Sequence, residues 1–228
     1  MERLARTWRR LLAAAFLHRC FYLFFALVLL VGIAPILSVS DRGRIAANVI
    51  NVLVLISAVA VVARSRLALV IALLLAVPTL GLQVLGIADR DMRDLALSWV
   101  FGALFYAIAL GYLLAYVFRR QVMDTDKLYG AAAAYMMLGV FWTYLFRIVW
   151  HLYPESYAVA ASAPGEVVTN FLYLSFGLLT SSGTGDITPV QPLSKSLATL
   201  AQITGVLYVA ILIARLAGIY PSRIQGPG

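Results

Sequence analysis

Residues 180–186 have the types and spacing that could bind an ion through the main chain. They read Thr180, Ser181, Ser182, Gly183, Thr184, Gly185 and Asp186. The glycines can adopt unusual backbone angles at little steric cost, which lets successive carbonyl groups point toward one axis. Stacked rings of such oxygens replace the water around a cation without any titratable charge. The candidate ligands are therefore the carbonyls of residues 180–184, with a hydroxyl ring from Ser181 or Thr180.

This polar segment interrupts a sequence that is otherwise apolar enough for a membrane. The chain has 228 residues, of which 63% are hydrophobic and 12% are charged, and its mean hydropathy is +0.92. Unpaired peptide groups cost several kcal/mol each in hydrocarbon, so irregular backbone persists at membrane depth only inside protein or beside water. Residues 180–186 are therefore expected to be the working part of the molecule.

Six uncharged runs are long enough to cross a membrane, since about 20 apolar residues span roughly 30 Å of hydrocarbon. They are residues 20–39, 45–63, 67–88, 95–118, 128–146 and 196–214. The apolar run Val167–Leu179 is too short to cross and is expected to enter the membrane and turn back. The sequence predicts an all-α membrane protein with six transmembrane helices and a re-entrant helix before residues 180–186.

Basic residues set the expected orientation, because cytoplasmic loops carry an excess of lysine and arginine. The arginines before the first run are Arg3, Arg6, Arg9, Arg10 and Arg19. Six crossings return Arg215 and Arg223 to that same side, whereas a seventh would place both outside. We therefore expect an integral protein of a bacterial plasma (inner) membrane, with both termini in the cytoplasm.

The net charge of +8 is explained by this topology and by lipid rather than by nucleic acid, because no segment is long enough for a soluble binding domain. Residues 1–19 place Arg3, Arg6 and Arg10 at helical spacing. They are expected to lie as an amphipathic helix on the inner membrane surface, and a disordered basic tail is the alternative. The single cysteine, Cys20, excludes a disulfide within the chain.

The first four runs make up an expected four-helix transmembrane domain, residues 20–118. A voltage sensor needs several charges that move through the membrane field, and the run 95–118 has no repeated arginines. Steep voltage gating is therefore not expected. A cytoplasmic linker, residues 119–127, leads to a second domain, residues 128–219, and residues 220–228 form a short tail.

Residues 170–219 read NFLYLSFGLLTSSGTGDITPVQPLSKSLATLAQITGVLYVAILIARLAGI. This stretch resembles the pore module of tetrameric potassium-channel-like proteins, which has a short pore helix, a TxxGxGD filter, a nearby proline and an inner helix. The resemblance covers residues 128–219 and implies a homotetramer that passes monovalent cations, K⁺ or Na⁺, through the carbonyls of residues 180–184. It implies no enzymatic activity and no cofactor other than these ions. The cation is expected to be K⁺.

Residues 180–186, the filter segment, depart from the pattern of the family at two positions. Thr184 stands where the family has an aromatic residue between the glycines, and Ser182 stands where it has a branched apolar residue. The outer filter is therefore expected to be wider or softer, with weakened discrimination between potassium and sodium. The hydroxyl of Ser182 would lie behind the filter, where it needs a partner or water.

Further candidates lie on either side of the filter segment. The resemblance makes Gly205 a gating hinge, and Gly205, Val209, Ile213 and Ala217 recur at the four-residue spacing of one helix face. Val209 and Ile213 are candidates for a hydrophobic constriction, and contact with lipid or another helix is the alternative. The outer carboxylates are expected to gather cations at the mouth, with an ordinary solvated loop as the alternative. They are Asp186, Glu155 and Glu166.

Two other classes of protein fit part of the pattern. Gly183-x-Gly185-Asp186 matches the GxGD signature of intramembrane aspartyl proteases, but such catalysis needs a second carboxylate within hydrogen-bonding reach. No other Asp or Glu lies inside a predicted span. A small-solute transporter would use broken helices in two related halves, and the sequence has one such break.

Overall fold

The computed structural model describes residues 19–37, 40–63, 66–88, 92–119, 124–159, 167–183 and 185–219. Five of its helices are long and apolar enough to cross a membrane. They are α4 (Asp41–Val62), α5 (Arg66–Ala88), α6 (Met92–Val117), α7 (Thr125–Leu152) and α9 (Pro192–Ile219). The prediction of an all-α membrane protein is confirmed at this level. The predicted surface helix and tail lie outside the described residues, except for Arg19.

The first predicted span differs from the expected single helix. The structure has α2 (Arg19–Gly32) and a one-turn helix α3 (Ala34–Leu37), separated by Ile33. Pro35 has no N–H group and cannot make the helical hydrogen bond to the carbonyl of Val31, so a break at this point follows from the sequence. With 14 residues, α2 is shorter than the about 20 that a crossing requires.

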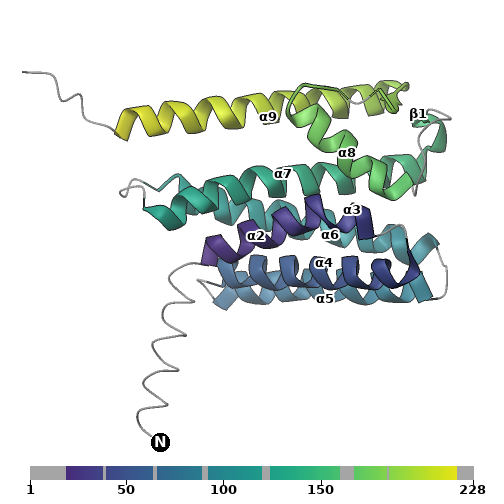
Figure 1. The fold of residues 1–228 in the computed structure, drawn as a ribbon, viewed down its shortest axis with the longest axis horizontal. Coiled ribbons are helices and arrows are strands. Elements are labelled where there is room, and N and C mark those ends of the chain that lie inside the picture. Colours follow the sequence, from purple (N-terminus) through teal and green to yellow (C-terminus); the bar gives the residue numbers. More distant parts are fainter. Residues whose placement is uncertain are drawn as a thin grey trace, which may run out of the picture.

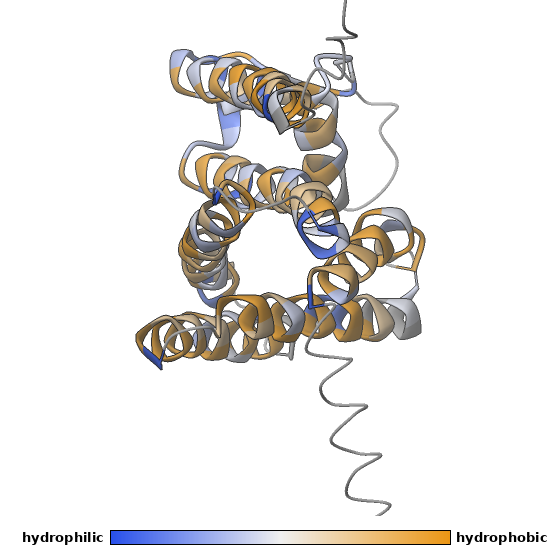
Figure 2. Ribbon diagram, turned by 90° about the vertical axis from the view of Figure 1, so that its left-hand side faces the viewer, coloured by the Kyte–Doolittle hydropathy of each residue, from blue (hydrophilic) through white to orange (hydrophobic). Residues whose placement is uncertain are grey.

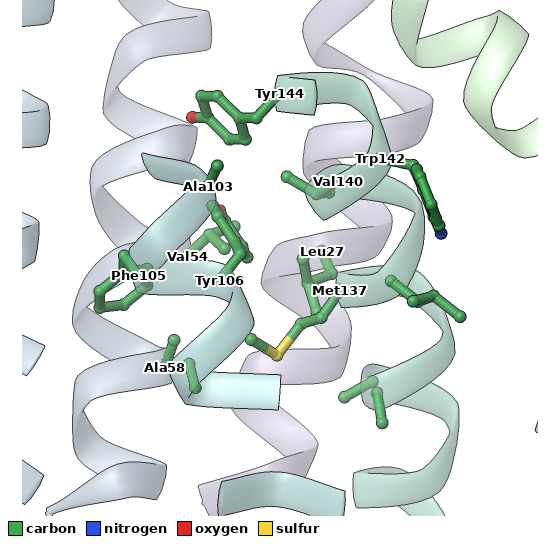
Figure 3. Packing of buried hydrophobic residues seen from close by; sticks show 14 of the residues in the cluster. Leu27, Val54, Ala58, Ala103, Phe105, Tyr106, Met137, Val140, Trp142 and Tyr144 are labelled. Atoms are coloured by element: carbon green, nitrogen blue, oxygen red, sulfur yellow. The ribbon is translucent and has the colours of Figure 1, made fainter. Parts of the chain in front are cut away.

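Helices α2, α4, α5, α6 and α7 pack into one bundle, in which α6 contacts both α5 and α7, and α2 contacts both α4 and α7. Figure 3 shows Leu27, Val54, Tyr106 and Met137 in its core. Viewed from its end, the bundle is apolar over most of each helix, as is typical of helices in lipid (Figure 2). The predicted outer helix of the second domain, α7, therefore packs directly against the four-helix domain.

The connection from α6 to α7 is short. Asp124 caps α7 by accepting a hydrogen bond from the Lys127 main-chain N–H at 2.9 Å, so the helix begins at Thr125, inside the predicted linker. A short connection between packed helices makes α6 and α7 antiparallel neighbours. At the opposite end, α7 continues to Leu152, beyond the apolar run that predicted it.

The chain between α7 and α9 begins and ends at the same end of the molecule. Strand β1 (Tyr157–Val159) pairs antiparallel with β2 (Ile187–Pro189), with Val159 opposite Ile187. Between them, α8 (Val167–Leu179) slopes between α7 and α9, and residues 180–186 lead back to β2 (Figure 1). A helix has therefore formed over the predicted range, and the paired strands bring the chain back to where it started.

Candidate functional site

Helix α8 is held on α7 at Gly139. The ring of Phe176 covers this glycine so closely that a Cβ atom there would lie 2.7 Å from Phe176 Cε1. The Ser175 hydroxyl donates a 2.6 Å hydrogen bond to the Gly139 carbonyl, and the Thr143 hydroxyl donates to the same oxygen at 2.9 Å. A small residue thus permits close approach, and a hydrogen bond in the buried interface fixes the register of α8 along α7.

Aromatic residues hold the start of α8. Phe171 is fully buried and packs edge-to-face against Tyr157 of β1, with the ring centroids 5.2 Å apart. Its ring also lies 5.9 Å from that of Trp150 at the end of α7. Burial raises the pKa of Tyr157, so its hydroxyl stays neutral. Both ends of α8 are therefore fixed, which fixes the point where residues 180–186 begin.

Helix α9 approaches the last residue of α8 at Gly205. A Cβ atom at this position would overlap the Leu179 carbonyl oxygen and lie 2.9 Å from the Leu179 Cα. Gly205 is buried, whereas Val209 and Ile213 are 42% and 60% exposed. The three residues keep their four-residue spacing within one continuous helix, and of them Gly205 is the one that α8 covers in the single chain. Gly205 contacts α8, and its role as a hinge stays a prediction.

Helix α9 touches α7 at two polar contacts. The Trp142 indole donates to the Thr204 hydroxyl at 3.1 Å, and the Tyr208 hydroxyl donates to the Ala131 carbonyl at 2.6 Å. Trp142 lies on the side of α7 opposite to the bundle core (Figure 3). Only 17% of the residues of α9 are buried, compared with 56% of those of α7. A wide apolar face remains uncovered in the single chain, formed by Leu200, Ile203, Val206, Leu207, Val209, Ile211 and Ile213.

Helix α8 ends in a Schellman motif. The Ser182 N–H donates to the Gly177 carbonyl and the Ser181 N–H donates to the Leu178 carbonyl, both at 2.9 Å. Ser181 takes the left-handed conformation that this motif requires, with a φ angle of 56°, at a position that is usually glycine. The cap turns the chain sharply away from the helix axis and leads into Gly183.

Left-handed residues then recur at every second position of this segment. Ser181, Gly183 and Gly185 have φ angles of 56°, 68° and 74°. Alternation of left-handed and ordinary residues turns successive N–H groups to one side of the chain and hence successive carbonyls to the other. Thr184 lies outside the described residues. Among the described residues of this segment, the positive φ angles thus fall at 181, 183 and 185.

The carbonyl oxygens of this segment are available to a ligand. Within the described part of the chain, no donor makes a hydrogen bond to the carbonyls of residues 180–183. Thr180, Ser181, Ser182 and Gly183 are all exposed in the single chain. Free main-chain acceptors at membrane depth need water, an ion or another chain as partner.

The predicted hydroxyl ring is reduced to one candidate. The Thr180 hydroxyl donates back to the Phe176 carbonyl at 2.8 Å and lies 3.0 Å from the Ser182 hydroxyl. Both of these side chains are thus directed at the last turn of α8. Ser181 remains as the residue whose hydroxyl can join the carbonyl ligands.

Of the predicted mouth carboxylates, Asp186 and Glu155 are exposed, and Asp186 lies directly between the glycine segment and β2. Glu166 lies outside the described residues. Lys195 is exposed in the first turn of α9 and partly offsets their charge. The arrangement leaves two carboxylates per chain free to interact with ions in solution.

The left-handed Ser181 gives a stability prediction. An L-residue in this conformation costs about 1–2 kcal/mol, and glycine avoids this cost but orders more backbone on folding. Ser181→Gly is therefore expected to stabilise the protein by about 0.5–1 kcal/mol. Thermal unfolding in detergent measures this, with Ser196→Gly, in the interior of α9, as a control that should destabilise. A loss of stability in Ser181→Gly would contradict the assigned cap.

Arg215 joins α9 to the end of α6. Its Nη1 atom donates to the Phe118 carbonyl at 2.8 Å, its Nη2 atom donates to the Arg119 carbonyl, and its guanidinium lies 5.3 Å from the centre of the Phe118 ring. The C-terminal end of a helix carries partial negative charge, which favours a cation there. Arg215 is thus a direct link between the four-helix domain and α9.

Removal of this link is expected to loosen the end of α9. In Arg215→Gln, amide hydrogen exchange over residues 212–219 should accelerate about tenfold or more, because hydrogen bonds from a charged group contribute about 1.5–3 kcal/mol. Arg66→Gln removes an exposed arginine at the start of α5 and should leave that exchange unchanged. Equal exchange in both variants would show that the link does not hold α9.

The chain matches no protein-family model, no curated protein and no solved structure at a significant level.

Proposed function

We propose that the protein is a homotetrameric channel for monovalent cations, with potassium as the principal ion and limited discrimination against sodium. The ligands are the main-chain carbonyls of residues 180–184, together with the Ser181 hydroxyl. The observation that carries this proposal is the positive φ angles at 181, 183 and 185, in a segment whose carbonyls at 180–183 accept no hydrogen bond from the described residues. Such a segment suits a cation that exchanges its water for protein oxygens.

Several chains are needed to complete such a site. One chain supplies one row of carbonyls, whereas an ion that leaves water needs oxygens on all sides. Cyclic assembly is the ordinary way to build a ring from one surface, and the sequence resemblance favours four copies. The uncovered apolar face of α9 and the exposed residues 180–183 both belong to the second domain, residues 128–219. Both would be covered if α8 and α9 face the shared axis.

The electrostatics favour cations over anions. The C-terminal end of α8 carries a partial negative charge and lies where the filter segment begins. Carbonyl oxygens present the negative end of their dipoles, and Asp186 and Glu155 add charge at the outer mouth. The site thus attracts cations without a titratable ligand in the filter itself.

The proposed channel is not opened by a charged sensor helix. Within α6 the charged residues are Arg93 and Asp94, both in its first turn, so no charge is placed to move through the membrane. Val209 and Ile213 on the uncovered face of α9 are the proposed constriction, which closes by excluding water. We place the protein in a bacterial plasma membrane with both termini in the cytoplasm, which requires α2 and α3 together to make the first of six crossings.

Electrical recording tests the proposal. Purified protein in a planar bilayer should pass current that reverses near the equilibrium potential of K⁺ under a KCl gradient, and native mass spectrometry should find four copies. A reversal near the chloride potential would refute a cation pathway. Transport only at the slow turnover typical of carriers would favour a small-solute transporter with a site at its broken helix.

A further inference from the structure

Two hydroxyl groups connect the filter segment to the last turn of α8. The Thr180 hydroxyl lies 2.8 Å from the Phe176 carbonyl oxygen and 3.0 Å from the Ser182 hydroxyl. The Ser182 hydroxyl also lies 3.3 Å from the Gly177 carbonyl oxygen. Ser182 comes after the Schellman cap, whereas Phe176 and Gly177 belong to the helix, so these contacts bridge the two parts.

The other hydrogen bonds decide where the hydroxyl protons go. The Gly177 carbonyl already accepts from the main-chain N–H groups of Ser182 and Gly183, at 2.9 and 3.1 Å. A carbonyl oxygen has two lone pairs, so both are taken. The shortest contact of the Thr180 hydroxyl is with the Phe176 carbonyl, at 2.8 Å, and that of the Ser182 hydroxyl is with Thr180, at 3.0 Å rather than 3.3 Å to Gly177. We therefore assign the Thr180 proton to Phe176 and the Ser182 proton to Thr180. The result is a directional hydroxyl chain from Ser182 through Thr180 to Phe176.

We propose that Ser182 and Thr180 are the positioning residues that set the ion preference of the filter. The hydroxyl chain fixes the peptide groups of residues 181–183 against α8 and so fixes where their carbonyl oxygens lie. These carbonyls accept no hydrogen bond from the described residues, which leaves the hydroxyl chain and the cap as what holds them. This inference rests on the proposed function, because the oxygen positions select an ion only if they bind one.

Ion selection depends on the spacing of the ligand oxygens and on their freedom to move. An ion smaller than the preferred one is rejected only while the oxygens resist moving inward. Loss of one hydroxyl removes a link of the chain, and the segment can then relax around either ion. The ratio of potassium to sodium permeability should therefore fall toward one.

The experiment compares four variants of the full-length protein. Ser182→Ala and Thr180→Val each remove one hydroxyl, the double variant removes both, and Ser182→Thr keeps a hydroxyl at position 182. Thr199→Ala is the matched control, because the Thr199 hydroxyl makes an i−4 hydrogen bond to Lys195 at 2.9 Å within α9. Amide hydrogen exchange at residues 182 and 183 is measured in KCl and in N-methylglucamine chloride, and permeability ratios are measured in bilayers.

In both salts, each single removal should accelerate amide exchange about fivefold, the effect of losing one net hydrogen bond. The double variant should resemble each single variant, because both hydroxyls belong to one chain and their effects are not additive. Ser182→Thr should exchange more slowly than Ser182→Ala, because it keeps a hydroxyl at position 182, and Thr199→Ala should behave as wild type. The potassium-to-sodium ratio should fall only in the variants with faster exchange.

The outcomes separate this inference from the proposed function. Wild-type exchange in Ser182→Ala, or additive effects in the double variant, would overturn the hydroxyl chain. Faster exchange with an unchanged permeability ratio would overturn its role in ion preference. Potassium should slow exchange at residues 182 and 183 in the wild type. If the removals accelerate exchange but potassium has no effect, the chain stands as a structural feature and the cation pathway is refuted.

Discussion

Gly205→Ala is expected to destabilise the protein and abolish ion flux. A Cβ atom at this position would lie 2.9 Å from both the carbonyl carbon and the Cα of Leu179, which are backbone atoms that cannot rotate away. Overpacking of this kind typically costs about 1–3 kcal/mol. The displaced residue directly precedes the filter segment, so a small shift of α9 moves the proposed carbonyl ligands in every subunit.

The sign of the stability change distinguishes a hinge at Gly205 from a packing contact with Leu179. Alanine favours a helix over glycine by about 0.8–1 kcal/mol where it meets nothing, so a pure hinge would be stabilised by the substitution. Gly218→Ala is the matched control, because a Cβ atom at Gly218, in the same helix, would have no neighbour within 4 Å. Thermal unfolding in detergent should show loss of stability only for Gly205→Ala. A gain in both variants would contradict the assigned contact with Leu179.

Gly183→Ala is expected to abolish cation flux while leaving α8 and α9 folded. The φ angle of Gly183 is 68°, and a Cβ atom there would meet nothing within 4 Å. The penalty is therefore conformational and about 1–2 kcal/mol per chain. All copies around an axis would bear it together, so the filter should adopt another conformation, which an ion flux assay in liposomes detects.

D-alanine is the control for chirality at this position. It prefers the left-handed region that L-alanine avoids, and the open space around Gly183 accepts its methyl group. Protein assembled by ligation of a synthetic C-terminal peptide with D-alanine at position 183 should retain flux. Equal loss with both enantiomers would show that the backbone conformation is not what matters there.

Much of the helical framework could be predicted from apolar run lengths. Val167–Leu179 has the same ends in the sequence and in the structure, because polar residues bound the run on both sides. Helix α7 extends past its apolar run to Leu152, because helical hydrogen bonding does not depend on apolar side chains. The break at Ile33 was missed, although Pro35 gave the signal for it.

The candidate site was predictable only where residue type alone decides conformation. Positive φ angles at Gly183 and Gly185 follow from the freedom of glycine. The left-handed Ser181 has no such signal, because the Schellman cap imposes it. Residue type alone does not identify Thr180 as the partner of the Ser182 hydroxyl. The four-residue spacing of Thr180 and Phe176 in the sequence was the available signal for the hydroxyl chain. The contact of Gly205 with Leu179 arises from tertiary packing, which spacing along one helix does not show.

The most direct measurement is a cryo-electron microscopy map of the detergent-purified protein in potassium chloride. The account predicts four copies around one axis, with α8 and α9 facing it and ion density between the carbonyls of residues 180–183 of the four chains. A monomer would contradict it. So would an assembly in which these carbonyls face away from the shared axis.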